Sequence, residues 1–420
     1  MTHRDLIRKY LDTYAEDESR CTWDFQSEWD SVLCVPICGE SANCIEQMLA
    51  ACVQKNVLVI AVINQPQEHP KAHGWQQQNQ ALMSHMTKLA KSTVSIRENM
   101  RLLGFDSGLS CLMIDRSSHH PIATKQGVGL ARKIAADMAL RLIHEGIIAT
   151  PWIFSTDADV QLPADYFEAV KKQDAAKVSA LCLPFQHCID DQPWSLQQHL
   201  YDFKLYYYQA GIRFAGAGYD YIPLGSTLVI SALAYAQVRG FPTRNGAEDF
   251  YILNKLAKLG RIEQPQGFLV SIQSRLSERV PFGTGPAVQA LMQQSNAVQQ
   301  PLYYHPKCFH YLKRWQQYLR GFWQQRELPE DDSVKTLFET FNLQSVFDKT
   351  LPHIRNETRW NQFVHEWLDA FRLLKSVHFL SEKLPLVNLQ ELLSIQEFSS
   401  IDVDGILNQQ GQMILAASRK

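Results

Sequence analysis

Several features that would assign a protein to a class are missing from these 420 residues. Lys and Arg total 41 against 43 Asp and Glu, so no strong overall field attracts a polyanion, and nucleic acid is not an expected partner. No stretch reaches the roughly 18 consecutive apolar residues of a membrane-spanning helix. The charged N-terminal segment also lacks the apolar run of a secretory signal. We therefore expect a cytoplasmic protein, whose contact with a membrane is at most peripheral, at the inner face.

The nine cysteines form no C-x-x-C pair and are odd in number. Several lie in apolar runs, so we expect reduced and mostly buried thiols. The sequence has no repeat of fixed period and no G-x-x-x-x-G-K-[ST] phosphate loop. What it does have is 45% hydrophobic and 20% charged residues, the composition of an ordinary globular protein.

Apolar segments of strand length alternate with segments of helical periodicity through about the first 270 residues, a pattern typical of an α/β protein with a mainly parallel sheet. Runs without polar alternation predict strands that are buried on both faces. The expected strands are residues 31–38, 57–63, 111–114, 151–155, 178–184 and 226–230, and the expected helices are residues 42–54, 131–145 and 247–259, with a further helix from about residue 163.

The character of the sequence changes near residue 286, where aromatic, Gln-rich segments with helical periodicity begin. We therefore expect two domains, an α/β domain over residues 1–285 and an α-helical C-terminal domain over residues 286–420. Within the first, residues 66–110 are interpreted as an insertion and residues 211–225, rich in Gly and Tyr, as a long loop.

The strongest chemical signal is a pair of carboxylates directly after the apolar run PWIFS at 151–155. Ligands of open α/β sheets bind outside the carboxyl ends of the strands. Asp157 and Asp159 at such a position could supply oxygen ligands to Mg²⁺ or Mn²⁺ that also holds a diphosphate. The alternative is a pair of acidic turn residues before the helix expected near residue 163.

A second signal is NGAED at 245–249, where a helix is expected to begin. Asn245 as N-cap with Glu248 three residues later matches a capping box, so Glu248 has a structural explanation. Asp249 has none, and a carboxylate at a helix N-terminus ionises readily. It could accept the proton of a substrate hydroxyl, or be a helix-dipole carboxylate without chemistry.

Three arginines form a third group of candidates. Arg132 in GVGLAR stands where a dinucleotide fingerprint needs a small residue, which weakens the Rossmann interpretation, but the first turn of a helix suits phosphate or carboxylate binding. Arg275 and Arg279 lie beside a Gly-containing loop and could close over a diphosphate. The alternative for each arginine is an exposed, solvated side chain.

Taken in order, these motifs resemble those of the family 2 glycosyltransferases, which have the GT-A nucleotide-sugar fold. The resemblance covers about residues 31–285. The set of motifs in this order is far more specific than any single motif. The matching segments are PICGE (36–40) with P-x-Y-N-E, GVGLARK (127–133) with G-x-x-x-A-R-N, STDADV (155–160) with D-x-D, and RGFP (239–242) plus AEDFYILNKLAKLG (247–260) with G-G-F plus the E-D-x-x-L helix.

The resemblance implies a metal-dependent transfer of a sugar from a nucleoside diphosphate donor to a hydroxyl acceptor, with inversion of the anomeric centre. It makes Asp249 the base, with Glu248 beside it, and gives Mn²⁺ or Mg²⁺ to Asp157 and Asp159. With the loop arginines included, the residues expected to bind the donor are Pro36, Glu40, Asn64, Arg132, Asp157, Arg275 and Arg279.

This sequence also departs from the family pattern. Cys38 and Gly39 replace Tyr-Asn, Lys133 replaces Asn, and Asn64 stands where many relatives carry an Asp that contacts the base or ribose, which leaves the nucleotide open. GVGLAR also resembles retaining relatives of the mannosylglycerate synthase type, which use no base and complete their metal site with a downstream His. No His lies between Gly211 and Tyr304, which weakens the retaining option without removing it, because His305 or His310 could take that place.

Two further functions compete with these. A nucleotidyltransferase would share the layered fold and acidic metal site but release pyrophosphate. A degenerate transferase fold could serve as a glycan-binding or scaffold protein, although the retained acidic pairs argue against it. The acceptor (small molecule, lipid-linked or glycan) and homo-oligomer formation stay open. The basic, aromatic segment 311–323 suits packing within its own domain or against a partner better than an anionic membrane surface.

Overall fold

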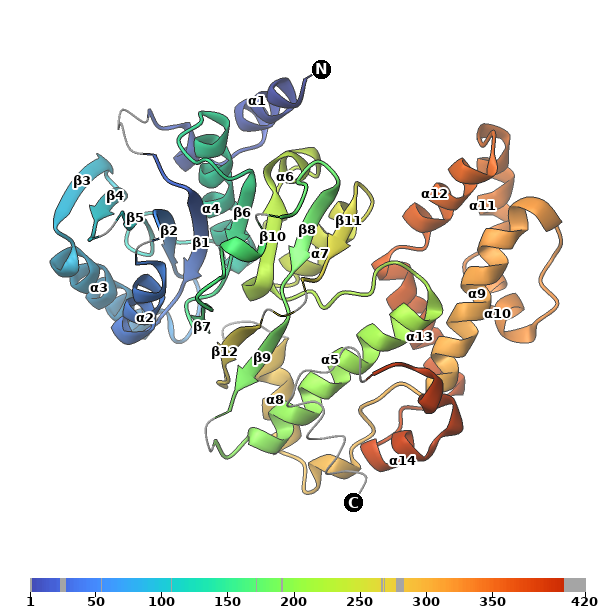
Figure 1. The fold of residues 1–420 in the computed structure, drawn as a ribbon. Coiled ribbons are helices and arrows are strands. Elements are labelled where there is room, and N and C mark those ends of the chain that lie inside the picture. The colour runs from blue at the N-terminus through green and yellow to red at the C-terminus, as the bar shows by residue number, and fades with distance from the viewer. Residues whose placement is uncertain are drawn as a thin grey trace. The chain divides into compact units, whose positions relative to one another are not determined.

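The structure, a computed structural model, describes residues 2–22, 28–53, 55–106, 108–170, 172–189, 192–265, 267, 269–276 and 283–403. The chain divides into two compact units, one formed by Met1–Cys188 with Pro223–Gly283 and the other by Ile189–Ile222 with Thr284–Lys420. The first unit is α/β and the second is built of helices (Figure 1). The α/β class and the helical C-terminal region expected from the sequence are confirmed.

The first unit is organised around a nine-stranded sheet in the order β11-β8-β10-β6-β1-β2-β5-β4-β3. Its centre, β6-β1-β2-β5, is parallel, whereas β10 and the β3–β4 hairpin pair antiparallel with their neighbours. The strands are β1 (Ser31–Ile37), β2 (Val57–Asn64), β3 (Ser92–Arg97), β4 (Met100–Gly104), β5 (Ser110–Arg116), β6 (Trp152–Ser155), β8 (Val178–Cys182), β10 (Leu228–Ser231) and β11 (Arg261–Glu263).

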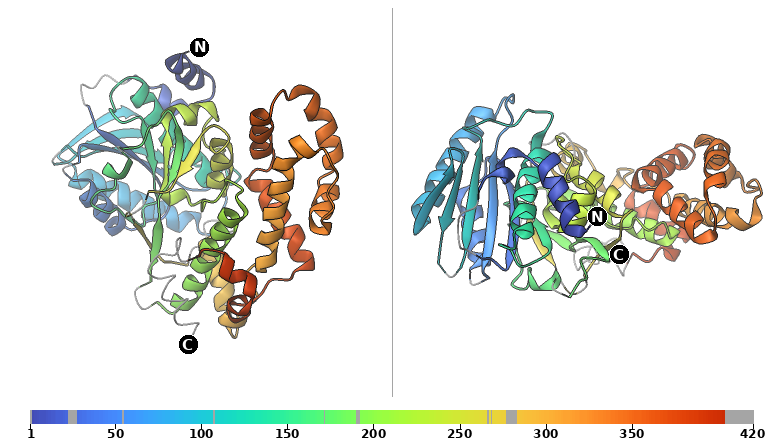
Figure 2. Two further views of the ribbon diagram at one scale, coloured as in Figure 1. Left: turned by 45° about the vertical axis from the view of Figure 1, so that its right-hand side comes forward. Right: turned by 90° about the horizontal axis from the view of Figure 1, so that it is seen from above.

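The central strands form because their sequences are apolar on both faces. Every residue of β1 and β2 is buried, as expected for parallel strands covered by helices. Helix α4 packs against both strands and is buried along most of its length. The strands of this unit are seen side by side in the second view of Figure 2. The helices of the unit are α1 (His3–Thr13), α2 (Ala42–Cys52), α3 (Ala72–Leu89), α4 (Gly127–His144), α6 (Ala232–Gln237) and α7 (Glu248–Leu256).

A second, three-stranded sheet follows directly from the carboxylate pair. Its order is β7-β12-β9, with β7 (Val160–Gln161) at one edge, directly after the carboxylate pair in the sequence. β12 (Val270–Gln273) runs antiparallel to β7 and parallel to β9 (Phe185–Cys188). This pairing brings the segment after β12 close to the carboxylates that precede β7.

Residues 66–110, interpreted as an insertion, contribute α3 and the hairpin of β3 and β4. The hairpin pairs with β5 through β4, from Met100 opposite Ile114 to Gly104 opposite Ser110. The segment therefore extends the main sheet at one edge.

The helix expected from about residue 163 is not formed. The described backbone makes turns there and one short 3₁₀ segment, Glu168–Val170. The consecutive rings of Tyr166 and Phe167 both pack on Phe154, with ring centroids 5.5 and 5.0 Å away. Successive residues of a helix point about 100° apart, so a tight turn serves this packing better.

The loop expected over residues 211–225 is also partly wrong, because helix α5 (Ser195–Ala215) continues through its first residues. The helix ends at Gly216, whose φ of 72° suits glycine. Gly211 lies inside the helix because Phe309 packs there, and an added Cβ would lie 2.4 Å from that ring.

The second unit buries its aromatic residues in a helical core. Helix α9 packs against α5, α10, α12 and α13, and Trp315 and Trp360 are fully buried. Segment 311–323 lies in α9 and buries Leu312, Trp315, Leu319 and Phe322. The helices are α5, α8 (Thr284–Met292), α9 (Pro306–Gln325), α10 (Asp332–Thr340), α11 (Leu343–Thr350), α12 (Glu357–Trp367), α13 (Ala370–Lys383) and α14 (Leu389–Ser394).

By contacts, Ile189–Ile222 belongs to this helical unit, whereas the expected boundary near residue 285 assigns it to the α/β domain. The apolar rings of α5 explain the difference, since Phe203 and Tyr207 pack on Tyr303. Among the described residues, no helix is both long enough and apolar enough to cross a membrane.

Candidate functional site

The candidate site lies in the first unit, where the carboxyl ends of three neighbouring parallel strands meet. Strand β1 lies between β6 and β2. Glu40 follows β1, Asn64 is the last residue of β2, and Asp157 and Asp159 follow β6. Parallel strands end at the same edge of a sheet, so the fold gathers residues that are distant in the sequence.

Arg132 links two of the predicted acidic residues. From the first turns of α4, its Nη2 lies 2.6 Å from Asp157 Oδ1 and its Nε 2.8 Å from Glu248 Oε1. Nη1 donates to Ser155 Oγ at 3.1 Å. Burial lowers the pKa of Arg132, but the carboxylates of Asp157 and Glu248 raise it further, so the side chain stays charged. With only 4% of its side chain exposed, Arg132 acts as an internal partner for both acids.

Arg275 links the other two acidic residues. Nη1 and Nη2 lie 2.6 and 2.7 Å from the two carboxylate oxygens of Glu40. Nη2 also lies 2.7 Å from Asp159 Oδ2. The backbone supports this position, because the N–H of Gln273 donates to the carbonyl of Asp159. Burial lowers the pKa of Arg275, and the hydrogen bonds to Glu40 and the charge of Asp159 raise it above the ordinary value.

Asp249 lies at the start of α7, next to Glu248. Burial and the Glu248 carboxylate raise the pKa of Asp249 to about 7, although hydrogen bonds from the backbone N–H groups of Phe250 and Gly225 act against them. A carboxyl group with a pKa near neutrality can accept a proton at physiological pH and release it again. This is the property that a general base requires.

The capping box expected at the start of α7 is not formed. The N-cap is Ala247, with φ of 57° and no side-chain cap hydrogen bond. Asn245 packs against the beginning of α4 instead, so close that a Cβ on Gly127 would lie 2.6 Å from Asn245 Cα. Glu248 faces Arg132, because a buried guanidinium provides a stronger partner than a backbone N–H.

Two residues that position the site were not identified by the sequence analysis. Asn79 on α3 is fully buried, accepts from the N–H of Gly39 at 2.9 Å and donates to the carbonyl of Asn64 at 3.1 Å. It thereby joins the segments that follow β1 and β2. Gly225 lies against Arg132, where a Cβ would be 2.5 Å from Nη2. Neither residue belongs to a motif, and only the tertiary contacts identify them.

Two of the other residues expected to bind the donor belong to the central strands. Pro36 is buried within β1, and Asn64, 6% exposed, ends β2. Arg279 lies outside the described residues.

The side chains of the site supply only part of what a divalent metal ion needs as ligands. Among the described residues, no group of three or more His, Cys, Asp or Glu could hold a metal ion. Asp157 and Asp159 offer the oxygen atoms that Mg²⁺ and Mn²⁺ prefer, and such ions are often held by two carboxylates together with substrate phosphates and water. The pair fits a metal that arrives with a diphosphate.

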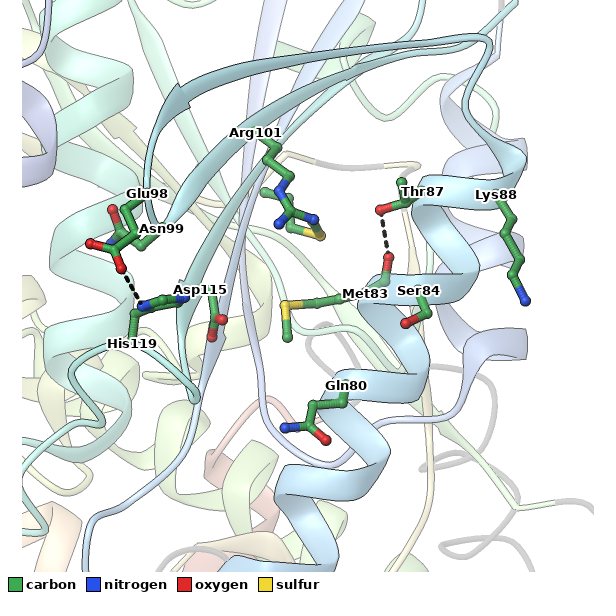
Figure 3. A pocket seen from close by; sticks show the side chains of 11 residues that line it. Gln80, Met83, Ser84, Thr87, Lys88, Glu98, Asn99, Arg101, Asp115 and His119 are labelled. Atoms are coloured by element: carbon green, nitrogen blue, oxygen red, sulfur yellow. Dashed lines mark hydrogen bonds and ion pairs between the residues drawn. The ribbon is translucent and has the colours of Figure 1, made fainter.

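A separate groove of about 560 Å³ lies between α3, the β3–β4 connection and the end of β5 (Figure 3). Its acidic side chains are held locally: Glu98 pairs with His119, and Asp115 accepts from the backbone of Ser117 and Ser118. None of the predicted site residues lines it. The lining residues are Gln80, Met83, Ser84, Thr87, Lys88, Glu98, Asn99, Arg101, Met113, Asp115 and His119.

Neither a protein-family model nor a curated protein matches the sequence. Among solved structures, the chain is similar to the mannosyltransferase PcManGT from Pyrobaculum calidifontis in complex with GDP-Man and Mn²⁺. The likeness covers 99% of this chain and 94% of that one, at 14% identity and a TM-score of 0.33. At this level the likeness carries no weight for function, which rests on the motifs and the site geometry.

Proposed function

We propose that the protein is a metal-dependent glycosyltransferase that moves a sugar from a nucleoside diphosphate donor to a hydroxyl acceptor. The observation that carries the proposal is the convergence of five acidic residues from three distant motifs through two arginines. Four of these acids contact Arg132 or Arg275, and Asp249 adjoins one of them. A diphosphate leaving group needs cations, and an acceptor hydroxyl needs a base, and the site offers both.

In the proposed reaction, Asp157 and Asp159 hold Mn²⁺ or Mg²⁺, which when bound supplies positive charge to the diphosphate. Glu40 contacts the nucleotide once Arg275 has moved. Asp249 takes the proton of the acceptor hydroxyl as its oxygen bonds to the sugar carbon C1 and the bond from C1 to the diphosphate oxygen breaks. Attack from the face opposite the diphosphate inverts the anomeric centre.

One observation favours the non-catalytic alternative, in which the fold only binds glycans or partners. Each carboxylate of the Asp157 and Asp159 pair already contacts an arginine, so both side chains have a partner without a ligand. A binding experiment separates this alternative from the transferase. The expected cytoplasmic location and peripheral membrane contact stay predictions.

The test is thermal unfolding in the presence of UDP, GDP, CMP, ADP or dTDP, with and without Mn²⁺. We expect one nucleotide to raise the Tm only together with the metal, because a ligand that binds the folded state stabilises it. Asp159→Ala should abolish the shift, and Asp165→Ala, at an exposed acidic residue of the same unit, should keep it. A folded protein that shifts with no nucleotide would favour the non-catalytic alternative.

The product then distinguishes the enzymes. With an acceptor present, a transferase releases a nucleoside diphosphate, whereas a nucleotidyltransferase releases pyrophosphate from a triphosphate. The anomeric configuration of the product, measured by NMR, distinguishes an inverting enzyme from a retaining one.

A further inference from the structure

Arg275 places a positive charge at the carboxylates that the proposed function assigns to the metal and the donor. Its guanidinium contacts both oxygens of Glu40 and, through Nη2, Oδ2 of Asp159. The contact with Glu40 is bidentate, the geometry in which an arginine binds a carboxylate most strongly. The same side chain therefore occupies one proposed metal ligand and one proposed nucleotide ligand.

We propose that Arg275 competes with the divalent metal ion for Asp159 and that it leaves both Asp159 and Glu40 when the metal and the nucleoside diphosphate bind. This inference rests on the proposed function, since it concerns the same site. A divalent cation bound to Asp159 would lie close to the guanidinium of Arg275, and their like charges repel at such a separation.

The two arginines of the site differ in how readily they can leave. Arg132 is 4% exposed and also contacts Ser155 and Glu248, so it is enclosed by its partners. Arg275 is 32% exposed and extends from the residues just after β12. An arginine that reaches solvent can exchange protein contacts for water at a lower cost than a buried one. Arg275 is therefore the cation that can be displaced.

Asp157 complements this arrangement. Its contact with Arg132 is at Oδ1, and about a third of its side chain, 35%, is exposed. Asp159, by contrast, is only 11% exposed and has Arg275 at Oδ2. We therefore expect a metal to reach Asp157 first and to gain Asp159 as a second ligand when Arg275 leaves. We therefore expect weak metal binding in the absence of nucleotide. The diphosphate offsets the displacement, because it offers the released guanidinium a new anionic partner.

The test measures Mn²⁺ binding by electron paramagnetic resonance and calorimetry, without acceptor and therefore without turnover. In the absence of nucleotide, Arg275→Gln should bind Mn²⁺ about tenfold more tightly than the wild type, the change expected when a charge-assisted contact no longer competes. Asp159→Asn should bind it more weakly than the wild type. Arg261→Gln is the matched control, because Arg261 is an exposed arginine of the same unit, paired with Glu263.

Arg275→Lys keeps the charge but cannot bridge two carboxylates in the planar geometry of a guanidinium. It should bind Mn²⁺ more tightly than the wild type and less tightly than Arg275→Gln. It also serves as the second variant if Arg275→Gln does not fold, which circular dichroism checks.

The outcomes separate the two proposals. If the wild type binds Mn²⁺ with a nucleoside diphosphate but neither Arg275 variant binds Mn²⁺ alone more tightly than the wild type, the competition is disproved and the proposed function stands. If no variant binds Mn²⁺ under any of these conditions, with or without each nucleoside diphosphate, the competition and the metal-dependent function both fail.

Discussion

Two consecutive residues of α4, Arg132 and Lys133, are both buried cations, but their surroundings differ. Lys133 Nζ lies 2.5 Å from Asp137 Oδ2 and donates to the carbonyl of Tyr14 at 2.8 Å. The hydroxyl groups of Tyr10 and Tyr235 both donate to Asp137 Oδ1. Asp137 is wholly buried, and both of its oxygens are occupied by residues of α1, α4 and α6 and the segment after α1.

The cluster of Arg132, Asp157 and Glu248 also pairs a buried cation with carboxylates, but it is more exposed to solvent, and we call it the open cluster. Exposure of its acidic side chains rises from 5% at Glu248 to 35% at Asp157. A carboxylate that keeps part of its surface in contact with solvent can accept a ligand, whereas one with both oxygens occupied and no exposure cannot. The buried charges around Lys133 are thus closed off from solvent, whereas those around Arg132 leave a carboxylate accessible to a ligand.

The largest predicted effect is a loss of stability when the closed cluster, formed by Lys133, Asp137, Tyr10 and Tyr235, is broken. Asp137→Asn keeps the volume but removes the charge that balances Lys133, and we expect the free energy of unfolding to fall by about 3–5 kcal/mol, as for other buried pairs that lose one partner. Urea unfolding monitored by circular dichroism measures it. Asp12→Asn, at an exposed position in α1, should change it by less than about 0.5 kcal/mol. A similar small change in both variants would contradict the structural role of the cluster.

In the open cluster, we expect a substitution to weaken ligand binding strongly and to lower stability only slightly. Asp157→Asn is expected to weaken the combined binding of Mn²⁺ and nucleotide by about 100-fold, the size of effect seen when a metal site loses a partner. Stability should fall by only about 1 kcal/mol, because Arg132 retains Glu248 and Ser155. Calorimetric titration measures the binding, with Asp165→Asn as the control. Unchanged binding would remove Asp157 from the site.

The sequence predicts the part of this comparison that depends on local pattern. The apolar runs of β1, β2 and β6 identify buried parallel strands, and the position of Asp157 and Asp159 directly after β6 places them at the carboxyl edge of these strands. The ion-pair partners of Glu248 and Arg275 could not be predicted. Glu248 fits a local capping box, but its partner Arg132 lies 116 residues away and replaces that local contact.

Contacts between residues distant in the sequence also explain why the helix expected after residue 163 and the loop expected over residues 211–225 were wrong or partly wrong. The segment after residue 163 has helical composition, but the packing of two neighbouring rings on Phe154 selects a turn. The Gly-rich composition near residue 211 suggests a loop, but the glycine is there because Phe309 requires its space. In both cases a contact with a residue distant in the sequence decides the backbone conformation, and no periodicity within a short window contains that information.

A smaller effect should follow from crowding Arg132 without removing any charge. A Cβ at Gly225 would lie 2.5 Å from Arg132 Nη2, so Gly225→Ala should lower the free energy of unfolding by about 1–3 kcal/mol, as overpacking does. Gly74→Ala is the matched control. Gly74 lies in α3 with nothing within 4 Å of an added Cβ, and the change should stabilise the protein by about 0.5–1 kcal/mol. Unfolding in urea compares the two, and loss of stability at both positions would refute the assignment to Arg132.

The smallest predicted effect is the pH dependence of stability and activity that Asp249, beside Glu248 of the open cluster, should cause. Its pKa is raised to about 7 by burial and by Glu248, from an ordinary value of 3.8. Between these two values the folded protein holds a proton that the unfolded chain has lost, so this group's contribution to stability is retained below about pH 4 and decreases as the pH rises to about 7. Activity should change in the opposite sense, because only the carboxylate accepts a proton: kcat/KM should rise about tenfold per unit up to about pH 7 and then level off. Asp249→Asn should remove both dependences, and an unchanged rate profile in this variant would show that another group is the base.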